Sequence, residues 1–220
     1  NLEEYRLNNS GGPLIGVNIG KNAVTPINKA TDDYLICLTK AYQLADYITI
    51  NISSPNTKNL RSLQGKDQLQ QLLETLKSAQ TVLADQYKKY TPLVVKLAPD
   101  MSEEELLESI EVIKAVQLDG VIATNTTLSR TEVQGLENAD EAGGLSGGPL
   151  TEKATQVVKV LTENLPSSIP VIAAGGIMEG EDAVEKLKAG AKLVQIYSGF
   201  IYGGMELIED VNEELIDYQS

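Results

Sequence analysis

The sequence contains no histidine and no tryptophan, and it has a single cysteine among 220 residues. The absence of histidine excludes a Ser-His-Asp triad, and one cysteine without histidine leaves no zinc ligand set. A single cysteine also excludes an intrachain disulfide bond, which is consistent with a reducing compartment. Cys37 lies at helical spacing from Tyr34, Leu38 and Ala41, which predicts a core residue rather than a nucleophile. Any proton relay in this chain must therefore run through other groups, such as hydroxyls and water.

Positive charge is also scarce, with 18 lysines and arginines against 31 aspartates and glutamates and a formal net charge of −13. This balance argues against a nucleic-acid-binding protein, because phosphate binding needs a basic surface. We expect no signal peptide at the start, and no apolar run approaches the roughly 18 residues that span a bilayer. The sequence contains no Walker or Rossmann phosphate-binding motif. The 42% hydrophobic content is nevertheless enough for one sizeable core.

Short apolar segments recur along the chain and are rich in β-branched residues. Continuous apolar runs of this kind predict strands that are buried on both faces, as in parallel sheets. The predicted strands are 14–18, 47–51, 92–97, 119–124, 170–174 and 193–197.

Helical patterns lie between these predicted strands. Thr31 is a candidate N-cap for the first helix, Ser102 and Glu105 have capping-box spacing, and Gly190 is a candidate C-cap. The regular alternation predicts a parallel sheet with helical crossovers, in the α/β class. Six β/α units fit either an open doubly wound sheet or most of an eightfold barrel. The predicted helices are 31–45, 67–88, 102–117, 151–164, 180–189 and 205–218.

Polar residues gather just after the predicted strands. One such residue is unremarkable, because Asn and Thr routinely cap helices and turns, but six consecutive polar strand ends favour a functional site. In a barrel the carboxyl ends of all strands converge on one face, where active sites lie. The residues concerned are Asn18, Asn51, Ser53, Ser54, Asn56, Lys96, Thr124, Asn125, Thr126, Thr127, Gly175, Gly176, Tyr197 and Ser198.

Lys96 lies inside the apolar segment VVKLAP, where a buried ammonium needs a partner or an anionic ligand unless its side chain reaches solvent. Gly175-Gly176 and Ser198-Gly199 follow the last two predicted strands, where barrel enzymes commonly hold a phosphate. The long connection 125–150, which carries GGLSGGPL at 143–150, is of a length that is usually functional or mobile.

Seven motifs stand out along the chain, namely GVNIGKN (16–22), INISSPNT (50–57), VVKLAPD (94–100), GVIATNTT (120–127), GGLSGGPL (143–150), AAGGI (173–177) and LVQIYSGF (193–200). In order and over nearly the whole chain, these motifs resemble those of the dihydroorotate dehydrogenases. The closer resemblance is to the class 2, membrane-associated, quinone-linked enzymes, which have serine as catalytic base in an N-x-S-S-P-N-T loop. Class 1 enzymes have cysteine at that position, which here is Ser54.

The resemblance implies a (β/α)8 TIM barrel that binds FMN. Residues 1–220 would form one barrel domain that supplies about six of the eight units, the third to the eighth. The first two strands and the N-terminal membrane-associating helices would be absent. The opening NLEEYRLNNSGG has no methionine and no obvious first element, so we expect a piece of a longer protein.

The resemblance also implies a reaction, the oxidation of (S)-dihydroorotate to orotate in de novo pyrimidine biosynthesis. FMN would accept the hydride and a quinone would be the final electron acceptor. Ser54 would remove the C5 proton, with Thr57 and water passing it outward, while Ser53 would be structural. The implied substrate-binding residues are Asn51, Asn56, Asn125 and Thr126. The implied FMN-binding residues are Asn18, Asn51, Lys96, Thr124, Ser146, Gly147, Gly176, Tyr197 and Ser198.

The expected partners are dihydroorotate, orotate and a quinone, with no nucleic acid and no metal. The full-length protein is expected to be a monomer, peripherally bound to the cytoplasmic face of a bacterial cell membrane, with the mitochondrial inner membrane as the alternative. Two other functions stay open. One is a class 1-like flavin barrel dehydrogenase with another electron acceptor, and the other is a truncated, inactive fragment.

Overall fold

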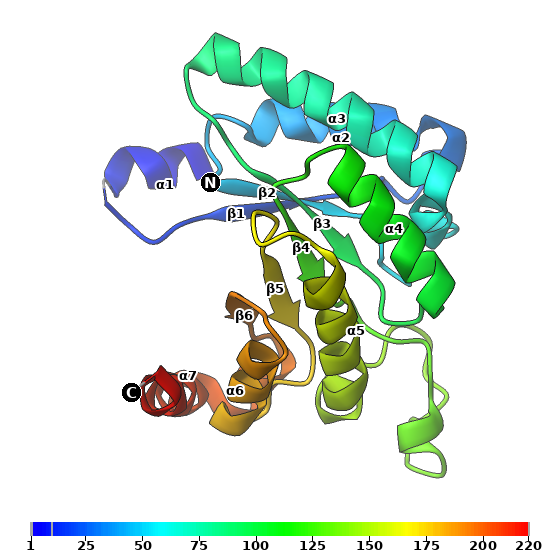
Figure 1. Ribbon diagram of the computed structural model, residues 1–220, viewed down its shortest axis with the longest axis vertical. Coiled ribbons are helices and arrows are strands. Elements are labelled where there is room, and N and C mark those ends of the chain that lie inside the picture. Colours follow the sequence, from blue (N-terminus) through cyan, green and yellow to red (C-terminus); the bar gives the residue numbers. More distant parts are fainter. Residues whose placement is uncertain (1, 10, 220) are drawn as a thin grey trace.

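The computed structural model describes residues 2–9 and 11–219, and it is built around one parallel sheet (Figure 1). The six strands lie in the order β1-β2-β3-β4-β5-β6. Each predicted strand is confirmed, although the first begins at Gly16 rather than at residue 14 and the sixth ends at Gln195. The strands are β1 (Gly16–Ile19), β2 (Tyr47–Asn51), β3 (Leu93–Leu97), β4 (Gly120–Ala123), β5 (Val171–Ala174) and β6 (Leu193–Gln195).

The strand order decides between an open doubly wound sheet and a barrel, the two architectures that fit the alternation of predicted strands and helices. In a doubly wound sheet the order reverses at a switch point, whereas in a barrel each strand pairs with the next one along the chain. Every pairing here joins consecutive strands in parallel, and β1 and β6 form the two edges. The sheet is therefore a curled part of a TIM barrel, as expected.

The helices from residue 30 onward lie along the outer side of this curled sheet, whereas the helix at 2–8 lies beside the start of β2 (Figure 1). Alternate strand residues, such as Ile48, Ile50, Val95 and Val121, pack into one large apolar core together with residues of the helices. Cys37 is half-buried and packs against this core, which confirms its predicted place. The helices are α1 (Leu2–Asn8), α2 (Ala30–Ala41), α3 (Lys66–Tyr87), α4 (Glu103–Ala115), α5 (Thr151–Asn164), α6 (Gly180–Lys188) and α7 (Ser198–Gln219).

Some helix boundaries differ from the predicted ones, and each difference has a local reason. Thr31 is not an N-cap, because the 3₁₀ helix Ile27–Lys29 leads directly into α2 and no side chain caps it. The capping box of α4 is confirmed, since the Glu105 amide donates to Ser102 Oγ at 3.2 Å. Helix α7 begins at Ser198, and a non-helical residue, Gly204, separates its first turns from the predicted helix at 205–218.

The first element of the chain was also missed, because α1 occupies Leu2–Asn8, where no element was obvious. None of the helices in the described part of the chain combines the length and the apolar character needed to cross a membrane. The connection after β4 is long, as predicted, and contains only the short 3₁₀ helices Thr131–Val133 and Gly148–Leu150. An isolated antiparallel bridge between Thr127 and Leu145 holds this connection against the end of β4.

Strand register places the polar residues on the side of the sheet opposite the helices. Asn51 pairs with Lys96, and Lys96 pairs with Ile122 in the next strand. Register partners point to the same face, and side chains along a strand alternate between faces. Because Ile50 and Val95 face the helical core, Asn51 and Lys96 face the inner, concave side of the barrel.

Candidate active site

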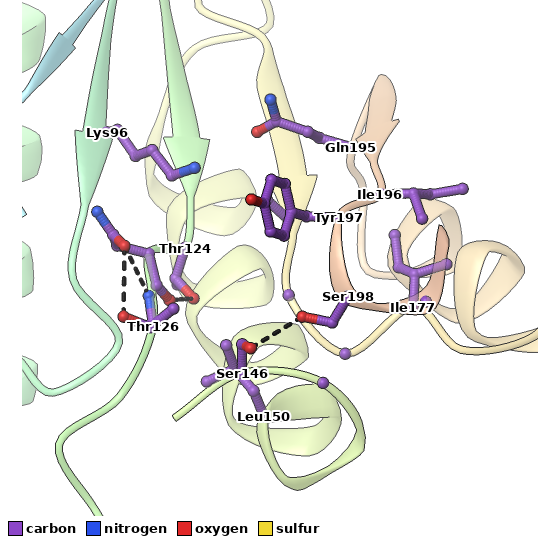
Figure 2. Close-up of a pocket in the computed structure, with 16 residues that line it drawn as sticks. Lys96, Thr124, Thr126, Ser146, Leu150, Ile177, Gln195, Ile196, Tyr197 and Ser198 are labelled. Atoms are coloured by element: carbon purple, nitrogen blue, oxygen red, sulfur yellow. Dashed lines mark hydrogen bonds between the residues drawn. The ribbon is translucent and has the colours of Figure 1, made fainter. Parts of the chain in front are cut away.

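A cavity of about 290 Å³ lies at the carboxyl ends of β3 to β6 (Figure 2). This position is the one where active sites lie in β/α barrels. The volume is at the lower end of the range of small-molecule pockets, about 300–1,000 Å³. The residues that line it are Lys96, Thr124, Asn125, Thr126, Ser146, Gly147, Leu150, Ala174, Gly175, Gly176, Ile177, Gln195, Ile196, Tyr197, Ser198 and Gly199.

Most of the residues predicted from the sequence meet in this cavity. The predicted residues in its lining are Lys96, Thr124, Asn125, Thr126, Ser146, Gly147, Gly176, Tyr197 and Ser198. Asn51, Ser54 and Asn56 lie beside the lining rather than in it, and Asn18 is exposed on the edge strand β1. Tyr197 is 81% exposed and therefore forms the open rim of the cavity.

Lys96 supplies a positive charge inside the cavity. Its side chain extends from β3 into the space that Gln195 and Tyr197 face (Figure 2). Burial lowers the pKa of the Lys96 ammonium, and no described residue accepts a hydrogen bond from it or pairs with it. The geometry therefore leaves this charge available to an anionic or electron-rich ligand.

The backbone after β5 takes a conformation that requires glycine. Gly176 has φ +73°, and a Cβ there would lie 2.3 Å from the Thr151 Cα. Thr151 Oγ1 in turn donates to the Gly176 carbonyl at 2.6 Å. The Gly175-Gly176 turn thus packs directly on the start of α5, and no side chain fills the cavity at this point.

Two serine hydroxyls meet at the same end of the cavity. Ser198 Oγ donates to Ser146 Oγ at 2.8 Å, which ties the loop before α5 to the start of α7 (Figure 2). Gly199 lets the start of α7 pack closely on the loop after β5, because a Cβ there would lie 2.1 Å from the Ile177 carbonyl oxygen. Hydroxyls, glycine backbone and a helix N-terminus form a donor set that suits a phosphate group.

A polar cluster lies between the ends of β2 and β4. Asn51 Oδ1 accepts hydrogen bonds from the Ser53 amide, the Ser53 hydroxyl and Asn125 Nδ2, each at 3.2 Å. Asn125 Nδ2 also donates to Ser53 Oγ at 3.1 Å. Ser53 is completely buried in this cluster, which agrees with a structural role.

Ser54 does not hydrogen-bond with this cluster and is only half-buried. Its Oγ accepts a hydrogen bond from the backbone N–H of Asn56 at 3.3 Å, and no charged side chain of the described residues hydrogen-bonds to it. The glycine-rich segment 143–150 lies against the loop that carries Ser54 and Asn56, since a Cβ on Gly143 would be 3.3 Å from Asn56 Oδ1. A Cβ on Gly144 would be 1.8 Å from Thr126 Oγ1, so glycine is required there.

Five contributors to the cavity were not predicted, namely Leu150, Ala174, Ile177, Gln195 and Ile196. Gln195 is the last residue of β6 and lies two residues before Tyr197, so strand alternation would have identified it. Leu150 and Ile177 come from loops, where no periodic pattern indicates which way a side chain points.

Comparison with known proteins places this chain in a family. The model of a family described as dihydroorotate dehydrogenase matches residues 2–218. The chain belongs to the dihydroorotate dehydrogenase family. The family assignment agrees with the resemblance seen in the sequence motifs.

Curated relatives of the dihydroorotate dehydrogenase family match most of the chain. The protein named dihydroorotate dehydrogenase (quinone) from Dechloromonas aromatica is 56% identical over 204 residues, which is 93% of this chain and 59% of that protein. The one from Chromobacterium violaceum is 53% identical over 205 residues, 93% of this chain and 60% of that protein. The chain thus spans about 60% of the length of these relatives.

A solved dihydroorotate dehydrogenase has the same fold. The crystal structure of DHODH in complex with ferulenol from Eimeria tenella superposes with a TM-score of 0.88 at 35% sequence identity. The match covers 98% of this chain and 62% of that one. The predicted fold, a TIM barrel present only in part, is therefore confirmed.

Proposed function

We propose that the protein containing this chain oxidises (S)-dihydroorotate to orotate, with FMN as hydride acceptor and a quinone as final electron acceptor, in de novo pyrimidine biosynthesis. Family membership and the names of the relatives support this proposal. The observation that carries it is the cavity with an unpaired ammonium, Lys96, near one end and a glycine turn with two serine hydroxyls at the other. In this proposal residues 1–220 supply the third to the eighth barrel units.

The donor set of the cavity fits a flavin mononucleotide. Ser146 and Ser198, with the backbone of Gly176, suit the phosphate, and Lys96 suits the electron-rich part of the ring system. When bound, the flavin supplies a hydride acceptor. The remaining proposed flavin contacts are Asn18, Asn51, Thr124, Gly147 and Tyr197.

The substrate would lie on the inner side of the barrel, between the flavin site and the loop that carries Ser54. Amide and hydroxyl side chains suit a planar ring with carbonyl, N–H and carboxylate groups. Asn125 and Thr126 lie in the cavity wall, and Asn51 and Asn56 lie next to it. We assign these four side chains to substrate binding.

Ser54 is the proposed base that takes the proton from C5 of the substrate. A hydroxyl is a weak base, so its surroundings must take up the proton. The half-buried position of Ser54 leaves a side open for water, and Thr57 lies three residues further along the same loop. The proposed proton path therefore runs from Ser54 through water and Thr57.

Serine at position 54, together with relatives named as quinone enzymes, favours the class 2 enzyme over a class 1-like dehydrogenase. Quinone binding and peripheral membrane contact, at the cytoplasmic face of a bacterial membrane, are proposed for the part of the relatives' length that this chain does not span. We propose a monomer.

The test uses full-length Ser54→Ala protein loaded with FMN. We expect flavin reduction by dihydroorotate at neutral pH to slow by at least about 100-fold, the range of general base catalysis, while FMN stays bound. Ser62→Ala is the control, because Ser62 is exposed and its hydroxyl donates only to the nearby Asn59 carbonyl. Near-normal flavin reduction in Ser54→Ala refutes the assignment of the base. A wild-type protein that dihydroorotate does not bleach refutes the proposed reaction.

A further inference from the structure

An arginine and an aspartate form a largely buried ion pair behind the candidate site. Arg61 lies in the 3₁₀ helix Leu60–Gln64, and Asp100 follows β3. Arg61 Nη1 donates to Asp100 Oδ2 at 2.8 Å, and the two side chains are 19% and 21% exposed. Neither residue lines the cavity or is among the residues proposed to bind the flavin or the substrate.

The same guanidinium also binds the backbone of two loops of the candidate site. Arg61 Nε donates to the Ser53 carbonyl at 3.0 Å, directly before Ser54. Arg61 Nη2 donates to the Thr126 carbonyl at 2.8 Å. One rigid, planar group therefore joins the loop after β2 to the loop after β4, and Asp100 joins it to the loop after β3.

Asp100 is itself fixed from several sides. Its carboxylate accepts hydrogen bonds from the Leu128 amide at 2.8 Å, from Lys153 Nζ at 2.5 Å and from Thr127 Oγ1 at 2.5 Å. Burial alone would raise the pKa of this carboxyl, but the hydrogen bonds from Lys153, Thr127, Leu128 and Arg61 outweigh it and lower the pKa to about 2. The Asp100 carboxylate, which anchors Arg61, therefore stays ionised at neutral pH.

We propose that Arg61 is a positioning residue that, together with Asp100, holds the Ser54 loop at a fixed distance from the Asn125-Thr126 loop. This inference rests on the proposed function, in which Ser54 is the base and the second loop binds substrate. Rates of proton transfer depend steeply on such spacing, because a misplacement of about 1 Å can cost roughly 100-fold. Arg61 acts here through the backbone carbonyls of the two loops and lies outside the lining of the cavity.

The test uses the full-length, FMN-loaded protein with Arg61→Lys. Lysine keeps the charge but cannot make three directed hydrogen bonds in the plane of a guanidinium. We expect flavin reduction by dihydroorotate to slow by at least about 10-fold, while the dissociation constant of orotate changes by less than about threefold. Amide hydrogen exchange in residues 52–57 should speed up by at least about 10-fold, because the Ser53 carbonyl loses its hydrogen bond from Arg61.

Arg6→Lys is the matched control. Arg6 also joins an aspartate, Asp46, to a backbone carbonyl, that of Leu44, but it does so before the start of β2, at the end of the strand opposite the Ser54 loop. We expect its flavin reduction and its hydrogen exchange in 52–57 to stay within about twofold of wild type. Asp100→Asn is the second variant, since it removes the charge that orients Arg61, and it should change the rate and the exchange in the same direction as Arg61→Lys.

The inference is overturned if Arg61→Lys and Asp100→Asn reduce flavin within twofold of wild type, or if exchange in residues 52–57 is unchanged. It is also overturned if rate and orotate affinity fall in proportion, because that pattern indicates general destabilisation rather than misplacement of the base. Failure of the proposed function looks different, since the wild-type flavin is then not reduced by dihydroorotate at all. In that case hydrogen exchange in residues 52–57 still tests whether Arg61 holds the Ser54 loop in place.

Discussion

Asn125 donates a hydrogen bond to Asn51 Oδ1 at 3.2 Å, although the two side chains belong to the ends of β2 and β4, which β3 separates. Neighbouring strands are about 4.8 Å apart, so a direct contact between the ends of β2 and β4 requires side chains that reach over β3 on the concave face. The curvature of the sheet brings these ends together. The contact makes Asn51 a structural acceptor as well as a proposed ligand-binding residue.

The first prediction tests the structural role of Asn51. Asn51→Ala leaves the Ser53 amide, the Ser53 hydroxyl and Asn125 Nδ2 without their shared acceptor, which should cost about 1–3 kcal/mol of unfolding free energy. Asn51→Asp keeps an oxygen in the same place, so its stability at pH 7 should stay within about 1 kcal/mol of wild type. Urea denaturation of flavin-free protein measures both. Equal losses in the two variants contradict the role of Oδ1 as acceptor.

The sheet and most helices were predictable because their signals are local. Apolar runs with polar ends mark the strands, and the limits of α5 match the predicted 151–164. Helix α1 was missed because a short, charged segment carries little helical signal of its own. Its place depends on Arg6, whose Nε donates to the Leu44 carbonyl at 3.0 Å and whose guanidinium pairs with Asp46. These partners are distant in sequence, so no local pattern indicates them.

The candidate site was predictable to the extent that parallel strand ends converge on one face. This rule placed Lys96, Asn125 and Ser198 in one cavity without any knowledge of loop conformation. It could not find Arg61, because Asp100 lies 39 residues away in the sequence and Thr126 lies 65 residues away. These hydrogen bonds of Arg61 depend on how three loops pack in space, which no local sequence pattern indicates.

The second prediction concerns Lys96. Burial lowers the pKa of its ammonium, so the folded state disfavours the charge at neutral pH, and stability should rise as the pH rises towards 10.5. Lys96→Met removes that penalty and breaks no hydrogen bond with a described residue. The urea midpoint of the flavin-free variant at pH 7 should therefore not fall, whereas FMN affinity, measured by fluorescence titration of the full-length protein, should fall at least about 10-fold. A lower midpoint with unchanged FMN affinity contradicts the assignment.

The third prediction tests the glycine turn after β5. Gly176→Ala places a Cβ 2.3 Å from the Thr151 Cα at a φ of +73°, so both the clash and the backbone strain oppose it. We expect a loss of roughly 3 kcal/mol or more in urea denaturation. Gly135→Ala is the control, because φ is +80° but no atom lies within 4 Å of the added Cβ. It should cost only the strain, about 1 kcal/mol. Equal losses at the two positions show that close packing on Thr151 contributes nothing.

The last prediction concerns stability in acid and the Asp100 carboxylate. Its pKa is about 2 in the folded protein against an ordinary value of 3.8. A lowered carboxyl pKa stabilises the fold above pH 3.8, and this contribution disappears as the pH falls through about 2. Asp100→Asn lacks the contribution at every pH, so the difference between wild type and variant should be largest at neutral pH and shrink between pH 4 and pH 2. Allowing for partial exposure, the pH-dependent part should be about 1–2 kcal/mol.

Urea denaturation of flavin-free protein at a series of pH values measures this difference, because all other carboxyl groups are common to both proteins and cancel. Asp85→Asn is the matched control, since the Asp85 side chain is 83% exposed and pairs only with Lys88 on the surface. Its difference from wild type should stay nearly constant over the same pH range, because solvent screens an exposed pair. A difference for Asp100→Asn that is equally flat would mean that the hydrogen bonds from Arg61, Lys153, Thr127 and Leu128 do not hold the carboxylate as the structure shows. A stability difference that shrinks as the pH falls would show that Asp100, which anchors Arg61, is ionised in the folded protein. This result would be independent of any activity measurement.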